Sequence, residues 1–298
     1  MENGEIIWGR AKDLYEKFNI INIKNSDLNL KQNSFAIFLQ SNNKLLEILE
    51  LTKLEWDSNH FDKNIWSMRF LLNSPSLTTS ILTNLESTLE NLCLSLSIDC
   101  LFCRTEISFH HLVHWLENMK FNLMDTLVTM EYVFNDKSKH SSDNKHRLTL
   151  VNDSLYTNQI MQIAEQIYTT DRFHTDPHLN NIQCNKLYSC WVRNQSEKSD
   201  ADIFILEKKP DILAFAICKH LNNEEVNIQL LGVEPKYQGK KLGKELIQSL
   251  LVYYEKKVKK VTIGTQLTNI RAIKCYLSEG FKIVSSQHNF HKHLQKFN

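Results

Sequence analysis

The sequence predicts an α+β protein of two domains, and three observations lead to this prediction. The chain has 298 residues, about twice the size of a common single domain. Residues 135–147, NDKSKHSSDNKHR, include no hydrophobic residue and cannot bury surface, which is typical of a linker. The residues after this stretch follow an order of helices and strands that ends in a parallel crossover. We therefore expect an N-terminal α/β domain at 1–134, a linker at 135–147 and a second domain at 148–298.

Hydrophobic periodicity predicts each element of the second domain in order. A strand at 148–152 leads into a helix at 154–169, and a second helix follows at 182–194. Three strand-like runs with polar turns between them predict an antiparallel meander. The runs and the elements that follow them are strands at 201–207, 212–220 and 226–233, a glycine-containing loop, a helix through Leu246, Leu250 and Tyr253, a strand at 261–265, a helix at 269–278 and a strand from Phe281.

The end of the first domain has a pattern like the end of the second. Residues 115–121, WLENMKF, resemble residues 276–281, YLSEGF, with one residue inserted, and a strand-like run follows each. An amphipathic helix that leads into a strand is common, so duplication and chance explain the match about equally well. A smaller, degenerate copy of the second domain is one interpretation of the first.

Composition and charge exclude several classes of protein. Lys and Arg number 35 against 34 Asp and Glu, a formal net charge of +1, which does not favour an extended nucleic-acid interface. Residues 1–18 carry charges throughout, unlike a signal peptide, and apolar runs such as 212–218 are too short to cross a bilayer. We expect a cytoplasmic protein without a nucleic-acid or membrane partner, and a homodimer stays open.

Cysteine and histidine spacing does not predict a metal site. The chain has seven cysteines and no export signal, which favours reduced thiols. Cys100 and Cys103 form one Cys-x-x-Cys in a strand-like run without a second pair. His110, His111 and His114 lack the intervening Glu of the zincin pattern, so an ordinary helix face is the better interpretation.

The most informative segment is 226–243, VNIQLLGVEPKYQGKKLG, in which a strand runs through a loop into a helix. Such a loop directs unpaired N–H groups and the positive end of the helix dipole at a ligand, and phosphate is the natural one. Gly239 and Gly243 permit close approach, and Lys240, Lys241 and Lys244 add positive charge. A solvated, lysine-rich turn is an equally good interpretation of these residues on physical grounds alone.

Residues downstream of the loop resemble the GNAT family of acetyl-CoA-dependent N-acetyltransferases. Asn269, Ala272, Tyr276, Gly280 and Phe281 reproduce the family segment N-x-x-A-x-x-x-Y-x-x-x-G-F. In the loop, Gln238 and Gly243 match the pattern Gln or Arg, two residues, Gly, one residue, Gly or Ala, but Lys241 stands where the middle Gly is usual. If that position needs a positive φ, lysine there costs about 1 kcal/mol.

The resemblance implies a mixed sheet flanked by helices for the second domain, and transfer of acetyl from acetyl-CoA to an amine. It also implies that Tyr276 protonates the leaving thiolate and that a backbone N–H near Val233 binds the thioester oxygen. A route through Cys275 as nucleophile is the less favoured alternative. The residues that the resemblance assigns to acetyl-CoA binding are Leu231, Gly232, Val233, Gln238, Gly239, Lys240, Lys241, Leu242, Gly243, Lys244 and Asn269.

Two further segments are similar to the dTDP-fucosamine acetyltransferase group of that family. These are 54–58, LEWDS, and 172–177, RFHTDP, and they imply a nucleotide-linked amino sugar as acceptor. We expect Arg172 to pair with its diphosphate, and Trp56 or Phe173 to stack on its base, in a cleft that the first domain helps to form. The alternatives are core packing for the aromatics and a surface ion pair for the arginine.

The sequence leaves the general base and the acceptor open. The base candidates are Asp171, His174, Asp176 and His288. A protein, a polyamine or an antibiotic can supply the amine instead of a sugar, and a catalytically inactive acyl-CoA-binding module is the alternative from another class. Asn269 and Tyr276 favour an active enzyme over that module.

Overall fold

The computed structural model describes residues 5–18, 34–41, 44–72, 79–135, 145–151 and 154–294. The chain forms two compact units: unit 1 comprises Met1–Met124 and Gln287–Asn298, and unit 2 comprises Asp125–Ser286. This division differs from the expected boundary at 135–147, and residues 136–144 of that expected linker lie outside the described residues. The difference arises because each unit contains a strand that follows the last helix of the other, as shown below.

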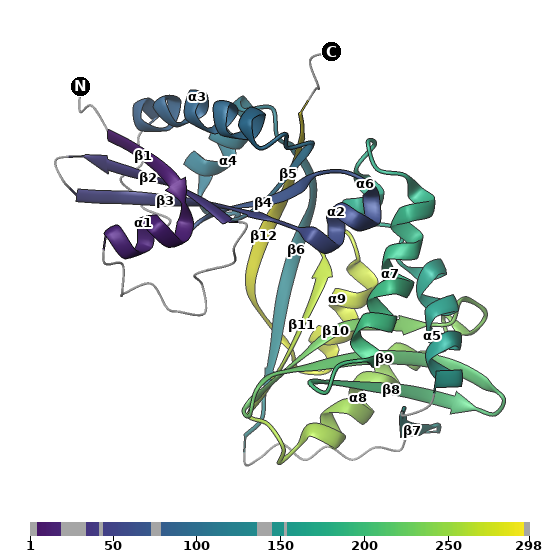
Figure 1. The fold of residues 1–298 in the computed structure, drawn as a ribbon. Helices are drawn as coiled ribbons and strands as arrows, with labels where there is room; N and C mark the ends of the chain where they lie inside the picture. Colours follow the sequence, from purple (N-terminus) through teal and green to yellow (C-terminus); the bar gives the residue numbers. More distant parts are fainter. Residues whose placement is uncertain are drawn as a thin grey trace. The chain divides into compact units, whose positions relative to one another are not determined.

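Unit 1 is built on a mixed sheet in the order β1-β2-β3-β4-β5-β12 (Figure 1). Neighbouring strands within this sheet are antiparallel, except for β4 and β5, which are parallel. A parallel pair needs a crossover, and α3 supplies it. The elements are β1 (Glu5–Arg10), α1 (Ala11–Lys17), β2 (Ser34–Ser41), β3 (Lys44–Lys53), α2 (Glu55–Phe61), β4 (Ile65–Phe70), α3 (Thr79–Ser95), β5 (Cys100–Glu106), α4 (His110–Asn118) and the end of β12 (Lys282–His293).

The core of unit 1 forms because α3 presents one apolar stripe. Leu82, Leu85, Leu89 and Leu92 recur every three or four residues and are almost completely buried. They share a cluster with apolar residues of α4 and of the strands. The indole of Trp115 on α4 donates a hydrogen bond to the Leu82 carbonyl at 3.2 Å, which satisfies its buried N–H.

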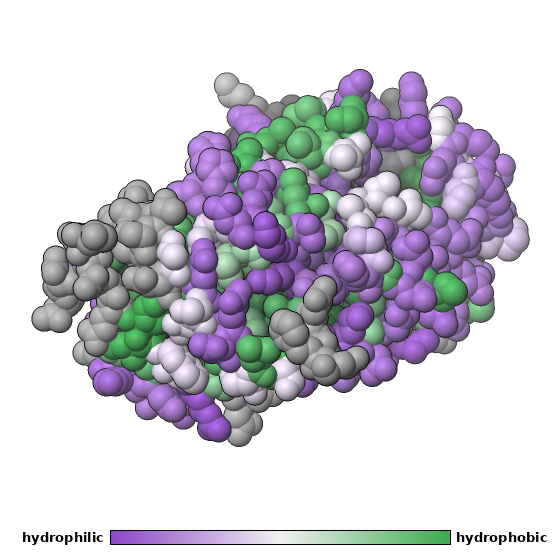
Figure 2. Space-filling model, turned by 90° about the horizontal axis from the view of Figure 1, so that it is seen from above, coloured by the Kyte–Doolittle hydropathy of each residue, from purple (hydrophilic) through white to green (hydrophobic). Residues whose placement is uncertain are grey.

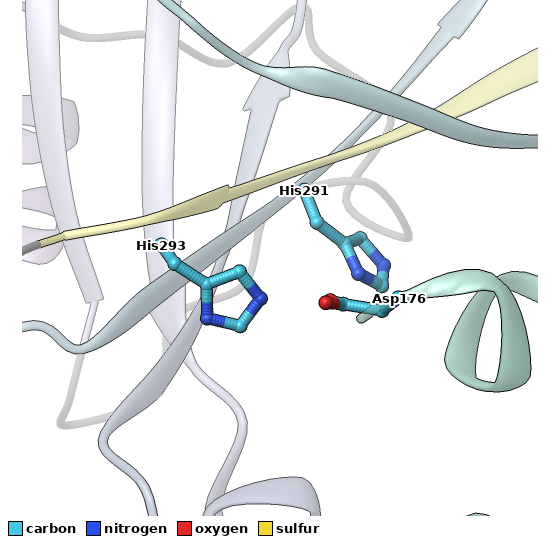
Figure 3. Close-up of side chains that lie close together, drawn as sticks. All are labelled: Asp176, His291 and His293. Atoms are coloured by element: carbon cyan, nitrogen blue, oxygen red, sulfur yellow. The ribbon is translucent and has the colours of Figure 1, made fainter. Parts of the chain in front are cut away.

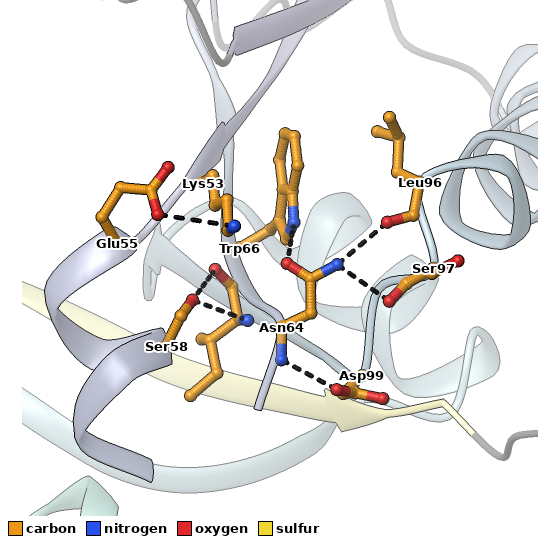
Figure 4. Close-up of polar contacts among 9 residues, drawn as sticks. Lys53, Glu55, Ser58, Asn64, Trp66, Leu96, Ser97 and Asp99 are labelled. Atoms are coloured by element: carbon orange, nitrogen blue, oxygen red, sulfur yellow. Dashed lines mark hydrogen bonds and ion pairs between the residues drawn. The ribbon is translucent and has the colours of Figure 1, made fainter. Parts of the chain in front are cut away.

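A polar centre at Asn64 holds the start of β4 in unit 1 (Figure 4). Its backbone N–H donates to the Asp99 carboxylate at 2.8 Å, and its side-chain amide donates to the carbonyls of Leu96 and Ser97. Its side-chain carbonyl accepts from the Trp66 indole at 2.9 Å. This one side chain therefore links β4 to the turn before β5.

Ser58 makes a second polar link in the same region (Figure 4). Its hydroxyl accepts from the backbone N–H of Ile65 at 3.0 Å and donates to the Ile65 carbonyl at 3.2 Å. Ser58 belongs to the LEWDS segment and is buried. Within unit 1 this serine ties α2 to β4, a structural reason for its presence.

Two histidines lie on the part of β12 that belongs to unit 1. His291 and His293 are two residues apart, so both rings project from the same side of the strand (Figure 3). The His291 ring stacks on Phe102 with centroids 3.9 Å apart, and Nε2 of His293 lies 3.7 Å from Sγ of Cys100. Cys103 projects from the opposite face of β5, and burial raises the pKa of its thiol to about 12.

Unit 2 confirms the predicted order of elements. Its sheet has the order β6-β11-β10-β9-β8-β7, with β8, β9 and β10 as an antiparallel meander and β10 parallel to β11. In Figure 1, α8 lies on one side of the β8–β10 strands, and α5 and α7 lie on the other. The elements are β6 (Asn122–Val133), β7 (Arg147–Leu150), α5 (Ser154–Ile167), α6 (Arg172–Thr175), α7 (Asn181–Ser196), β8 (Ala201–Lys208), β9 (Asp211–Asn222), β10 (Glu225–Val233), the 3₁₀ turn η1 (Pro235–Tyr237), α8 (Leu242–Tyr254), β11 (Lys260–Gln266) and α9 (Ile270–Ser278).

The later parts of the two units match at a constant offset of 160 residues. Ile65 pairs with Cys100 in unit 1, and Glu225 pairs with Lys260 in unit 2. Position 65 is therefore equivalent to position 225, and position 100 to position 260. The same offset relates β5 to β11, α4 to α9 and β6 to β12, residue for residue. The insertion expected between 115–121 and 276–281 is therefore wrong: Leu116, and not Trp115, occupies the place of Tyr276. Its carbonyl accepts from Phe121 as that of Tyr276 accepts from Phe281.

The last strand of each repeat completes the sheet of the other unit. β6 follows α4 in sequence, but its residues 127–133 pair with β11 of unit 2. β12 follows α9, but its residues 287–293 pair with β5 of unit 1. The chain thus exchanges two equivalent strands, which is why neither unit is one continuous segment.

Figure 2 shows one face of the molecule, on which hydrophobic residues gather in separate patches among hydrophilic ones. Scattered exposed apolar side chains are normal for a folded protein. No helix within the described ranges is long and apolar enough to span a membrane.

Candidate functional site

The site in unit 2 is organised around the edge of β10. β10 pairs with β11 over Glu225–Ile228 and Lys260–Ile263, and among the described residues the register goes no further. β10 itself continues to Val233 along β9, after an irregularity between Ile228 and Leu230. Its last residues therefore have an edge that β11 does not cover. Backbone N–H and C=O groups at such an edge can pair with an extended ligand that carries amides.

Gly232 near the end of β10 has no room for a side chain. A Cβ there would lie 2.1 Å from Cδ1 of Ile167 and 2.6 Å from Cε1 of Phe215. The glycine thus lets the last residue of α5 pack against the strand. Sequence reasoning assigns Gly232 to acetyl-CoA binding, and that role stays a prediction beside this packing role.

The predicted phosphate-binding loop lies between η1 and the first turn of α8. Gly239 has φ of 80°, and Lys241, the N-cap of α8, has φ of 64° and no side-chain cap. The expected cost of about 1 kcal/mol for a left-handed lysine therefore applies at Lys241. Because no side chain caps α8, the N–H groups of its first turn can receive an anion, and the helix dipole favours one there.

Other contacts hold this loop and set its charge. Gln238 donates its side-chain amide to the Val233 carbonyl at 3.2 Å, which joins the loop to the end of β10. Asp211 accepts from the Tyr237 hydroxyl at 2.6 Å and pairs with Lys236 at 3.1 Å. Lys240 lies over the Tyr237 ring, 4.9 Å from its centroid.

The lysine at the first turn of α8 is paired within unit 2. Lys244 lies 2.7 Å from the Glu279 carboxylate, so that acid partly neutralises its charge. The Gly243 position is less crowded than Gly232, because a Cβ there would lie 3.7 Å from Cγ2 of Val233. An alanine at 243 therefore fits the folded chain, and a larger side chain would extend towards Val233 and Leu231 at the end of β10.

α9 positions the predicted proton donor. Asn269 is the N-cap of α9, and its side-chain carbonyl accepts from the Ala272 N–H at 3.2 Å. This cap fixes the start of the helix that carries Tyr276. Tyr276 is buried, and burial, then its neighbour Cys275, raise the pKa of its phenol well above 10. A phenol with this pKa stays protonated at neutral pH and can donate a proton.

Cys275, the alternative nucleophile, is in a poor environment for a thiolate. Burial, followed by the charge of Glu279, raises the pKa of the thiol above its ordinary value, and Lys244 only partly opposes this. A nucleophilic cysteine needs a lowered pKa. The structure therefore favours direct transfer over a route through Cys275.

The predicted acceptor residues have different environments in the two units. In unit 2, the Arg172 guanidinium lies 4.4 Å from the centroid of the Phe173 ring, and Phe173 itself is buried. In unit 1, Trp56 is 38% exposed and stacks on His60 with centroids 5.4 Å apart. The cleft expected between Trp56 and Arg172 stays a prediction.

Two of the base candidates form an ion pair. Nδ1 of His174 lies 2.6 Å from Asp171, and its Nε2 lies 2.8 Å from the side-chain oxygen of Asn185. Burial alone lowers the pKa of His174, but these hydrogen bonds outweigh it and the pKa is raised. Burial alone raises the pKa of Asp171, but His174 outweighs it and the pKa is lowered. These two directions are those expected of a carboxylate and an imidazolium that stabilise each other, which favours a structural role over that of a base.

The other two base candidates differ in burial and in unit. Asp176 is 1% exposed in unit 2 and accepts from the His178 N–H at 2.9 Å. His288 belongs to the part of β12 in unit 1, and burial lowers the pKa of its imidazole, although the charge of Glu117 opposes this. A lowered pKa leaves a histidine neutral at pH 7, the form that accepts a proton.

Sequence reasoning missed Tyr168, the residue that follows α5. Its hydroxyl is buried and has no hydrogen-bond partner among the described residues. A tyrosine after an amphipathic helix has the pattern of a core aromatic, so only the structure draws attention to it.

Comparison with known proteins agrees with this geometry. Residues 158–281 match the model of the acetyltransferase (GNAT) family. The spore coat polysaccharide biosynthesis protein SpsD of Bacillus subtilis (strain 168) is 29% identical over 136 residues, or 45% of this chain. The match covers 47% of that relative, so the chain spans about half the length of the curated protein it resembles.

Solved structures share the fold over nearly the whole chain. A GCN5-related N-acetyltransferase from Sphaerobacter thermophilus has a TM-score of 0.62 at 10% identity, over 96% of this chain and 86% of its own. A tandem GNAT protein from the clavulanic acid biosynthesis pathway has a TM-score of 0.58 at 10% identity, over 99% and 100%. The predicted fold is thus confirmed: the chain has the GNAT fold in a two-domain arrangement.

Proposed function

We propose that the chain is a cytoplasmic N-acetyltransferase that moves acetyl from acetyl-CoA to the amino group of a nucleotide-activated amino sugar. One observation carries the proposal. In unit 2 the uncovered edge of β10 leads into the uncapped start of α8, and α9 supplies a buried tyrosine. An amide-pairing edge, an anion site and a proton donor are what an acyl-CoA thioester requires.

The donor side uses the loop and the strand edge for different parts of acetyl-CoA. The first-turn N–H groups of α8 and the charge of Lys240 and Lys241 suit the pyrophosphate. Residues 231–233 have backbone groups that suit the amides of the pantetheine arm. In this proposal Gly243, which has no side chain, lets the pyrophosphate approach the first turn of α8 closely.

The reaction follows from these positions. The neutral amine attacks the thioester carbon, a C–N bond forms, and the carbonyl electrons move to oxygen. The backbone N–H near Val233 donates to that oxyanion. When the intermediate collapses, the C–S bond breaks, and the thiolate takes the proton from the Tyr276 hydroxyl. The positively charged nitrogen loses one proton, and one proton returns to the Tyr276 phenolate, so the products are an amide and neutral CoA thiol and the tyrosine is restored.

Arg172 supports an acceptor that carries phosphate. Its guanidinium lies over the Phe173 ring, and a guanidinium is the side chain best suited to bind a diphosphate in a bidentate way. The matching relative is named for spore coat polysaccharide biosynthesis, which agrees with a sugar substrate. In this proposal the buried Phe173 supports the arginine.

The test is a turnover assay with acetyl-CoA and a panel of amines. dTDP-linked 4-amino sugars, other nucleotide-linked amino sugars, polyamines, an aminoglycoside and peptides are compared, and release of CoA thiol is measured. We expect turnover with a nucleotide-linked amino sugar. Turnover restricted to polyamines, the aminoglycoside or peptides contradicts the acceptor, and the absence of turnover with every amine contradicts the enzyme.

Arg172→Ala tests the acceptor side separately. We expect a KM for the sugar raised about tenfold or more, in line with the loss of a charge-assisted hydrogen bond, at unchanged KM for acetyl-CoA. Arg193→Ala is the matched control, because Arg193 is an exposed arginine in the last turn of α7. Equal sugar kinetics in the two variants would remove Arg172 from the site.

A further inference from the structure

The hydroxyl of Tyr168 has no explained role in the fold of unit 2. It is buried, and no described residue accepts a hydrogen bond from it. A buried hydroxyl without a partner costs roughly 1–3 kcal/mol. A phenylalanine at this position would avoid that cost, so the hydroxyl calls for a partner that the chain alone does not supply.

Packing fixes the ring that carries this hydroxyl. Tyr168 stacks on Tyr188 of α7 with centroids 4.3 Å apart and planes 23° apart. Tyr188 stacks in turn on Trp191, with centroids 6.2 Å apart. Ile167, the residue before Tyr168, occupies the space that the missing side chain of Gly232 leaves. The stack thus fixes the ring on one face, and the packing of Ile167 on Gly232 fixes the neighbouring backbone against β10.

The surroundings of the hydroxyl identify where it points. Burial, then the nearby phenol of Tyr276, raise the pKa of Tyr168 well above 10, and the Leu231 backbone partly opposes them. The residue before Tyr168 packs on Gly232, which places Tyr168 close to the end of β10 that β11 does not cover. It stays protonated, which makes it a hydrogen-bond donor at neutral pH.

We propose that the Tyr168 hydroxyl donates a hydrogen bond to the carbonyl oxygen of the bound thioester, beside the backbone N–H near Val233. This inference rests on the proposed function, because it assumes that the acyl group lies at the end of β10. During attack by the amine, the carbonyl electrons move to that oxygen and the Tyr168 bond strengthens. When the C–S bond breaks, the oxygen becomes the amide carbonyl, and Tyr168 keeps its proton throughout.

This role differs from that of Tyr276, although both are buried phenols. Tyr276 gives up a proton to sulfur, whereas Tyr168 only orients and stabilises oxygen. A preformed donor of this kind contributes most when its own position costs no reorganisation. The stack on Tyr188 and the contact of Ile167 with Gly232 supply that rigidity.

The test is Tyr168→Phe, which keeps the stacked ring and removes only the hydroxyl. Tyr156→Phe is the matched control, since it makes the same change on α5, where the Tyr156 hydroxyl donates to Glu207 at 3.2 Å. Calorimetry compares the affinity for acetyl-CoA with that for S-ethyl-CoA, a thioether without the carbonyl. Thermal unfolding and kcat are measured on the same proteins.

We expect the wild type and Tyr156→Phe to prefer acetyl-CoA over the thioether by about 3- to 10-fold, and Tyr168→Phe to lose that preference. We also expect kcat of Tyr168→Phe to fall by roughly 10²- to 10³-fold, as for other oxyanion donors, without a lower melting temperature. A merely structural tyrosine would leave preference and kcat unchanged, and that result overturns the inference.

The binding comparison needs no acceptor amine. The proposed function and the role of Tyr168 can therefore be contradicted independently of each other. Wild type that prefers acetyl-CoA but acetylates no amine contradicts the proposed function, while loss of the preference in Tyr168→Phe still supports the role of Tyr168. Wild type that acetylates an amine, with an unaltered preference in Tyr168→Phe, contradicts the role of Tyr168 alone.

Discussion

The two units share a backbone plan but differ in the residues that do chemistry. At the constant offset of 160 residues, Tyr276 of unit 2 corresponds to Leu116 of unit 1, and the cap Asn269 corresponds to Phe109. Around the start of α8, residues 236–244 read KYQGKKLGK, whereas the residues 160 positions earlier, 76–84, read SLTTSILTN, with neither glycine nor lysine. Unit 1 keeps the parallel strand pair and both helices of this region, but it has none of these predicted site residues at the equivalent positions. The comparison shows that the fold persists without the site, so the fold alone does not assign the activity.

The largest expected effect comes from the Tyr276 position. Tyr276→Phe should lower kcat by about 10²- to 10⁴-fold, because the leaving thiolate loses its proton donor. Its affinity for acetyl-CoA should change little, as measured by calorimetry beside steady-state kinetics. Leu116→Met, a change of similar volume at the equivalent place of unit 1, is the control and should leave kcat unaltered. Unchanged kcat in Tyr276→Phe would make this tyrosine a packing residue like Leu116.

The next effect concerns the ion pair of Asp171 and His174 in unit 2. Asp171→Asn keeps the oxygen that caps α6 but removes the charge beside a buried imidazolium, so it should lower the free energy of unfolding by about 3 kcal/mol at pH 6. The stability that protonated His174 contributes is fully present below its unfolded pKa of 6.5. Because the folded pKa is raised, this stability is lost as the pH rises through the folded pKa. The contribution of Asp171, whose folded pKa is lowered, is full above 3.8 and is lost as pH falls through it.

The pair should therefore matter most between about pH 4 and 6.5. Urea unfolding of wild type and Asp171→Asn at pH 6 and pH 9 measures this. The difference in unfolding free energy should shrink as the pH rises through the folded pKa of His174 and the imidazole loses its proton. An equal difference at both pH values would show that the pair is not ionic.

The smallest effect contrasts one backbone position in both units. Lys120 and Gly280 are equivalent and have left-handed backbones, with φ of 63° and 88°. Gly280→Ala should lower the free energy of unfolding by about 1–2 kcal/mol, because its Cβ would lie 3.2 Å from Cε2 of Tyr132. Lys120→Gly should instead raise it by up to about 1 kcal/mol. Chemical unfolding measures both, and changes of the same sign would contradict the equivalence of the two positions.

The fold of unit 2 could be predicted closely because its periodicity is strong and local. Every expected strand and helix from 148 onward is present within a few residues. The exchange of β6 and β12 could not be predicted, because a strand has the same alternation whichever sheet it joins. For the same reason the sequence places a boundary in the polar stretch, whereas the compact units divide within two strands.

The site could be predicted in part. The loop and Tyr276 have a recognisable spacing. The sequence also indicates that lysine at position 241 costs free energy if its φ is positive, and the structure has a left-handed backbone there. The close approach at Gly232 depends on α5, which is distant in sequence, so the sequence alone does not reveal it. Tyr168 was missed for the same reason, since its hydroxyl is unusual only in the folded chain.

The central claim is that unit 2 alone holds an acyl-CoA site, and the stoichiometry of acetyl-CoA binding tests it most directly. Calorimetric titration of the full chain should give one site per chain. Gly243→Val should abolish the binding of acetyl-CoA. The control Gly243→Ala should keep the melting temperature of the wild type, because the folded chain has room for a Cβ at position 243. Two sites per chain, or one site with equal affinity in Gly243→Val, would contradict the account.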